Sequence, residues 1–75
     1  MSKHNGHKNW NHWNVSLWLN NDEGLYITMR EYMTDYRTKD KAAEALVEHL
    51  VELGFTRTPD GAPYSFSSIR AAMSD

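Results

Sequence analysis

Hydrophobic positions in the middle of the chain recur at spacings of three and four. This spacing places side chains on one face of an α-helix, which has about 3.6 residues per turn. The helix is expected to begin near Asn21 or Asp22, because acidic residues favour the positive end of a helix dipole. Its apolar face comprises Leu25, Met29, Tyr32, Met33 and Tyr36.

A second helical pattern extends from about Thr38 to Leu53. Gly54 is its predicted stop, since glycine readily takes the left-handed conformation that ends many helices. Phe55 follows and is expected to fold back on Leu50. The apolar stripe of this helix comprises Ala43, Leu46, Val47 and Leu50.

The C-terminal third of the chain combines a turn-rich segment with a short helix. Residues 56–63 contain two prolines, an aspartate and a glycine, which are typical of turns. Ser65 is then predicted to cap a last helix, with Tyr64 and Ile69 in hydrophobic-staple positions. The side chains expected to face inward are Phe66, Ile69 and Met73.

The first segment is compatible with two structures. Asn11 can cap a helix, with Trp10 and Val15 in staple positions. Apolar and polar residues also alternate over residues 13–19, the period of a half-buried strand. Helix is favoured because few other segments could pair with a lone strand. The prediction is an all-α domain of three to four short helices, with an α+β fold containing a strand at residues 13–19 as the alternative.

Composition limits the class of protein. The chain has 75 residues and no cysteine, which excludes disulfides, thiolate zinc sites and cysteine nucleophiles. Residues 1–8 are expected to form a flexible tail and residues 9–75 a single helical domain. No stretch resembles a signal peptide or a membrane span, so a cytoplasmic location in a bacterial host is expected. A net charge of −2 disfavours direct DNA binding.

Three tryptophans lie within nine residues, at Trp10, Trp13 and Trp18. Burial in a Trp/Tyr/Met/Leu core is favoured, because large rings bury much apolar area. The alternative is an exposed surface that binds a partner or a second copy of the chain. Trp13 and Trp18 cannot both lie centrally on one helical face, so at least one is expected to be partly exposed.

Four acidic residues repeat at intervals of four on the third predicted helix: Asp40, Glu44, Glu48 and Glu52. They are expected to lie along one face, about 6 Å apart, where like charges repel. Such a row can imitate nucleic-acid phosphates or dock on a basic groove. A solvated helix face is the more ordinary explanation.

Catalytic and metal-binding signatures are weak. His4, His7, His12 and His49 could in principle bind a metal, but three of them lie in or near the expected tail. No serine sits in a recognisable nucleophile elbow, and the glycines are scattered. The sequence predicts no enzyme activity, no cofactor and no functional metal site.

The stretch from Trp13 to Leu19, followed by Asn-Asp-Glu-Gly-Leu-Tyr at residues 21–26, resembles a family of small uncharacterised proteins encoded by bacteriophages, plasmids and related mobile elements. Residues 53–61 are similar to the second half of that family. The resemblance implies a helical fold and a mobile-element origin, and it implies no activity.

The favoured functional hypothesis is a non-enzymatic mobile-element protein that inhibits a host defence complex by protein–protein contact. An anti-CRISPR inhibitor that binds a CRISPR effector is the expected kind, and the acidic row with Trp13 and Trp18 would contact the partner. A structural or regulatory homo-oligomer, such as a homodimer formed through the tryptophans, is the alternative. A small nucleic-acid-associated regulator is a further one.

Overall fold

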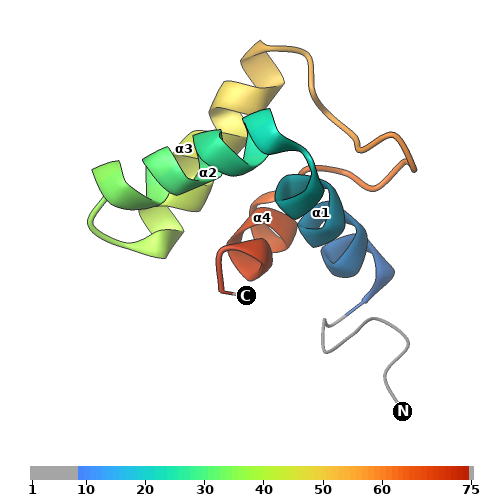
Figure 1. Ribbon diagram of the computed structural model, residues 1–75, viewed down its shortest axis with the longest axis horizontal. Helices are drawn as coiled ribbons and strands as arrows, with labels where there is room; N and C mark the ends of the chain where they lie inside the picture. The colour runs from blue at the N-terminus through green and yellow to red at the C-terminus, as the bar shows by residue number, and fades with distance from the viewer. Residues whose placement is uncertain (1–8, 75) are drawn as a thin grey trace.

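Four α-helices make up the regular structure of the computed structural model, which describes residues 9–74 (Figure 1). They are α1 (Trp10–Asn21), α2 (Glu23–Asp35), α3 (Lys39–Glu52) and α4 (Phe66–Ala72). The predicted all-α fold is confirmed, and the alternative strand at residues 13–19 is wrong. Within the described residues, the one extended pairing is a bridge between Arg57 and Pro63 in the α3–α4 loop, so a strand there would have found no partner. The expected tail, residues 1–8, lies outside the described residues.

Three of the four helices begin at or next to the residue that the sequence predicted. The side chain of Asp22 accepts a hydrogen bond from the amide of Leu25, and Thr38 and Ser65 cap α3 and α4 in the same way. The cap predicted at Asn11 is wrong. Asn9 is extended and accepts from the amide of His12 at 2.9 Å, so α1 starts one residue before Asn11.

Gly54 stops helix α3, as predicted: the helix ends at Glu52 and Leu53 is its C-cap. Gly54 has a φ of 86°, the left-handed conformation that other residues adopt only with strain. The Phe55 amide donates to the Leu50 carbonyl at 2.8 Å, and the Gly54 amide donates to the Val51 carbonyl at 3.0 Å. These two bonds form a Schellman motif, which turns the chain sharply out of α3.

The core is mainly aliphatic, includes Met29, Tyr64 and Met73, and contains no tryptophan among the described residues. α1 packs most extensively on α4, while α2 lies alongside α3 (Figure 1). The most buried large side chains are Leu19, Leu46, Leu50, Ile69 and Val15, and four alanines fill the remaining contacts. The prediction of a core built on tryptophan is therefore wrong. At about 100° per residue, Trp13 lies roughly opposite Val15 on α1 and cannot share its buried face.

Two aromatic residues predicted to face inward are on the surface. Phe66 is 42% exposed and Tyr36 is 41% exposed, whereas Ile69 and Met73 are buried as predicted. Both exposed rings lie at helix ends, Phe66 at the first position of α4 and Tyr36 at the cap of α2, where the periodic face no longer meets a neighbouring helix. None of the helices is long and apolar enough to cross a membrane over residues 9–74.

Candidate partner-binding surface

The loop between α3 and α4 is tied to α1 by a hydrogen-bond network. The carboxylate oxygen Oδ2 of Asp60 accepts from Nδ2 of Asn14 and from Nε1 of Trp18, each at 2.9 Å. Oδ1 of the buried Asn14 in turn accepts from Oγ1 of Thr58 at 2.6 Å. The bonds from Asn14 and Trp18 favour the ionised carboxylate, so they lower the pKa of Asp60. The polar atoms of Asn14 and Trp18 thus position the loop.

The same loop is also closed on itself. The Thr58 amide donates to the Ala62 carbonyl at 2.8 Å, and the Ala62 amide donates to Oγ1 of Thr58 at 3.1 Å. Gly61 supplies the left-handed turn, with a φ of 100°. The guanidinium of Arg57 donates to the Gly61 carbonyl at 2.9 Å. The loop is therefore a defined structural element and not a loose connection.

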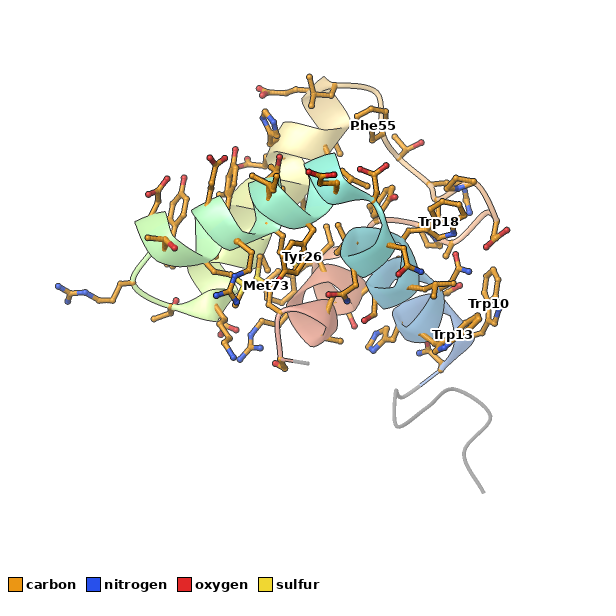
Figure 2. The ribbon with its side chains drawn as sticks, in the orientation of Figure 1. Trp10, Trp13, Trp18, Tyr26, Phe55 and Met73 are labelled. Carbon is orange, nitrogen blue, oxygen red and sulfur yellow. The ribbon has the colours of Figure 1, made fainter. Side chains whose placement is uncertain are left out.

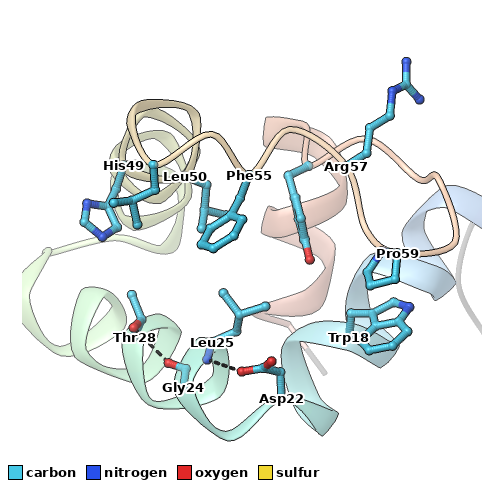
Figure 3. Close-up of a pocket in the computed structure, with 12 residues that line it drawn as sticks. Trp18, Asp22, Gly24, Leu25, Thr28, His49, Leu50, Phe55, Arg57 and Pro59 are labelled. Atoms are coloured by element: carbon cyan, nitrogen blue, oxygen red, sulfur yellow. Dashed lines mark hydrogen bonds between the residues drawn. The ribbon is translucent and has the colours of Figure 1, made fainter.

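An open cleft of about 510 Å³ lies between this loop, the end of α1, the start of α2 and the end of α3 (Figure 3). Its size falls in the usual range for ligand pockets, roughly 300–1,000 Å³. Asp22, Thr28, His49 and Arg57 contribute polar groups. The apolar lining is provided chiefly by Trp18, Leu25, Leu50, Leu53, Phe55 and Pro59.

Apolar side chains at this cleft remain in contact with solvent. Leu53 is 56% exposed and Phe55 is 51% exposed, whereas Tyr64 is nearly buried in the lining. Burial raises the pKa of Tyr64, and the charge of Asp22 adds to the effect. Exposed large apolar groups that meet at one concave site mark it as a place for a ligand or partner.

The four acidic residues of α3, Asp40, Glu44, Glu48 and Glu52, are all exposed, and we name them the acidic ridge. Asp40 differs from the other three because its carboxylate accepts from Nε of Arg70 on α4, at 2.6 Å. Within the described part of the chain, no ion pair joins the other three to a cation. Residues 42–56 contain no lysine or arginine. The negative charge of the ridge is therefore concentrated on its last three members.

An aromatic cluster connects the ridge to the cleft. The rings of Tyr32 and Tyr36 stack with centroids 5.8 Å apart, and Tyr32 also contacts His49 at 5.7 Å. Partial burial raises the pKa of Tyr32, with further contributions from Tyr36, Glu52 and Asp35. Glu52 lies one turn after His49 on α3, and His49 contacts Tyr32 and lines the cleft. The ridge reaches the cleft at this end of α3.

Of the two tryptophans predicted to bind a partner, only Trp18 belongs to this surface. Trp18 lines the cleft beside Pro59 (Figure 3). Trp13 lies near Trp10 toward the start of α1, away from Phe55 and the cleft (Figure 2). Trp13 and Trp18 are both partly exposed, which confirms the expectation that at least one of them would be. Trp10 is 41% exposed.

A histidine and a serine that the sequence did not connect lie together on another face. Nε2 of His12, on α1, is 2.6 Å from Oγ of Ser67, on α4. The pairing links the two helices but spans 55 positions, so no local pattern could reveal it. No group of three potential metal ligands occurs among residues 9–74, and His4 and His7 lie outside them.

Comparison with known proteins places the chain in a family without assigning it an activity. No curated protein and no solved structure matches it. The match to a family extends over residues 1–75, the whole chain. The protein belongs to DUF7249, a family of unknown function.

Proposed function

We propose that the protein is a non-enzymatic binding protein of a bacteriophage or related mobile element, which inhibits a host defence complex by direct protein–protein contact. An anti-CRISPR activity against a CRISPR effector is the proposed kind. The mobile-element origin is supported by the resemblance carried by residues 13–19 and 21–26. The host compartment in which it would act is the bacterial cytoplasm.

The observation that carries this proposal is the charge of Glu44, Glu48 and Glu52. These side chains are exposed along one helix and lack a described cationic partner. Like charges at this spacing destabilise a helix by about 0.2–0.5 kcal/mol per pair. A basic surface on a partner would relieve that repulsion and would be attracted over a distance by the complementary potential. Effector complexes that hold nucleic acid present such basic grooves.

The test is a phage-challenge assay in bacteria that carry an active CRISPR system. Expression of the protein should raise the yield of a targeted phage. The triple variant Glu44→Lys, Glu48→Lys, Glu52→Lys should lose this effect while keeping the helical circular dichroism of the parent. The single variants Glu48→Lys and Glu31→Lys are a matched pair of exposed charge reversals, on α3 and α2: the first should weaken inhibition and the second should retain it. A triple variant that still protects the phage would show that the acidic ridge does not contact the defence complex.

A second candidate, a homo-oligomer, is favoured by exposed aromatic rings at the starts of α1 and α4. Trp10 and Phe66 are each about two-fifths exposed, and buried aromatic anchors supply much of the energy of many interfaces. Light scattering across a range of concentrations tests this candidate. A dimer that dissociates on Trp10→Ser would support it, and a monomer at all concentrations would remove it.

A further inference from the structure

We infer that the cleft between α2, α3 and the α3–α4 loop receives one bulky apolar side chain from a lysine- or arginine-rich segment of a protein partner. This inference rests on the proposed function, because it places an apolar anchor beside the acidic ridge. It adds a second binding determinant that charge alone does not supply.

The shape and lining of the cleft suit an apolar anchor. Leu25, Leu50 and Phe55 project into it, and Trp18 and Pro59 close one end (Figure 3). Leu53 and Phe55 expose more than half of their surface, so an incoming side chain would remove apolar area from water on both partners. Interface anchors of this type bind in well-packed pockets surrounded by polar groups.

The walls of the cleft are already ordered before a partner binds. The Schellman motif at Gly54 fixes the position of Phe55 at the end of α3. The bonds from Asn14 and Trp18 to Asp60 hold the opposite wall, including Pro59, against α1. Binding therefore does not have to order a loop, which is one of the main costs of association.

Charge at the rim selects a basic segment. Glu52 immediately precedes the cleft residue Leu53, and Asp22 lines the cleft from the start of α2. The nearest cation in the lining is Arg57, whose guanidinium is bonded to the Gly61 carbonyl and points away from the cleft (Figure 3). Lysines or arginines on either side of an apolar anchor would therefore face carboxylates.

The test is a nuclear magnetic resonance titration of the isotope-labelled full chain with short synthetic peptides. The probe is a lysine-flanked phenylalanine peptide, with one comparison peptide that replaces phenylalanine by alanine and another that replaces the lysines by glutamates. The probe should shift the amide signals of Leu25, Leu53 and Phe55. Loss of the phenylalanine should weaken binding by about tenfold or more, the effect expected of an interface anchor, and the glutamate peptide should not bind.

Two protein variants locate the binding. Leu53→Ser and Phe55→Ala change exposed cleft residues, and each should weaken binding of the probe peptide by about tenfold. Val51→Ser is the matched control, because Val51 is 55% exposed on the same turn of α3 but does not line the cleft. It should bind the probe as the parent does.

The remaining outcomes separate this inference from the proposed function. Equal binding of the phenylalanine and alanine peptides, with shifts confined to Glu44 and Glu48, would show that the cleft does not receive the apolar side chain. The acidic ridge would remain as a binding surface. Equal binding of the glutamate peptide would show that the cleft does not select a basic segment. Concentration-dependent shifts of Leu53 and Phe55 without peptide would show a second copy of the chain in the cleft and would also overturn the inference.

Discussion

The indole of Trp18 donates a 2.9 Å hydrogen bond to the carboxylate of Asp60, 42 positions further along the chain. This bond joins the two stretches that carry the family resemblance, residues 13–19 and residues 53–61. Asn14 and Thr58 form a second link between the same stretches. These bonds give the two stretches a structural role: they fasten the α3–α4 loop to α1 and so form one wall of the cleft.

Removal of the Asn14 side chain should destabilise the fold. Asn14→Ala leaves the buried hydroxyl of Thr58 without its acceptor, and an unsatisfied buried group costs about 1–3 kcal/mol. Urea denaturation should show a loss of about 2 kcal/mol in the free energy of unfolding. Asn11→Ala, an exposed change on the same helix, is the control and should have little effect. Equal stability of the two variants would show that the network contributes nothing.

Stability at acid pH should depend on Asp60. Hydrogen bonds from Asn14 and Trp18 lower the pKa of its carboxyl below the ordinary value of about 3.9. The folded state thus favours the ionised carboxylate. Its contribution to the stability of the fold is present above about pH 4 and is lost as the pH falls through the lowered pKa. Denaturation of the parent and of Asp60→Asn between neutral and acid pH measures this contribution. Their difference in stability should shrink as the pH falls, and a difference that is constant with pH would contradict it.

Stability at alkaline pH should depend on Tyr64. Burial, aided by Asp22, raises the pKa of this phenol above its ordinary value of about 10. The folded state favours the neutral phenol. The contribution of Tyr64 to the stability of the fold is therefore present below about pH 10 and is lost as the pH rises through the raised pKa. Tyr64→Phe cannot ionise and should show a weaker fall in stability on the alkaline side. An unchanged alkaline profile in the variant would assign the effect to other groups.

Two glycines should respond in opposite directions to substitution by alanine. Gly54 is left-handed at the end of α3, and an alanine there should cost about 1–2 kcal/mol. Gly24 lies inside α2, where an added methyl makes only an ordinary contact of 3.4 Å with the Asp22 carboxylate. Gly24 is the second residue of α2, so Gly24→Ala should stabilise by less than the roughly 0.5–1 kcal/mol of a mid-helix position. Thermal denaturation of both variants checks the signs, and a stabilised Gly54→Ala would refute the Schellman assignment.

The sequence predicted the parts of the fold that local chemistry determines. The helix starts near Asp22 and Thr38, the cap at Ser65 and the stop at Gly54 each depend on residues within one helical turn, and all four are confirmed. The start of α1 was misplaced because asparagine stands at both residue 9 and residue 11, and the same local rule fits either one.

Positions set by contacts far along the chain could not be predicted in this way. Trp18 was expected in the core or at an interface, but its indole N–H bonds Asp60, which no periodicity indicates. The acidic ridge was predicted from its spacing of four, which could not indicate that Asp40 pairs with Arg70, 30 residues away. The cleft combines four separate segments and leaves no sequence signature of its own.

The ion pair between Asp40 and Arg70 leads to a prediction about the individual residues of the acidic ridge. Asp40 and Arg70 form an exposed ion pair, with side chains 69% and 35% accessible, so Asp40→Asn should lower stability by less than about 1 kcal/mol. Because Arg70 compensates this charge, removal of the whole pair in Asp40→Asn/Arg70→Gln changes no net charge and should leave affinity for the proposed defence complex nearly unchanged. Glu48→Gln removes an uncompensated charge and should weaken that affinity and reduce its salt dependence. Calorimetric titrations of the double variant and of Glu48→Gln at low and high salt make the comparison, and equal losses of affinity would show that Arg70 does not shield Asp40 from the partner.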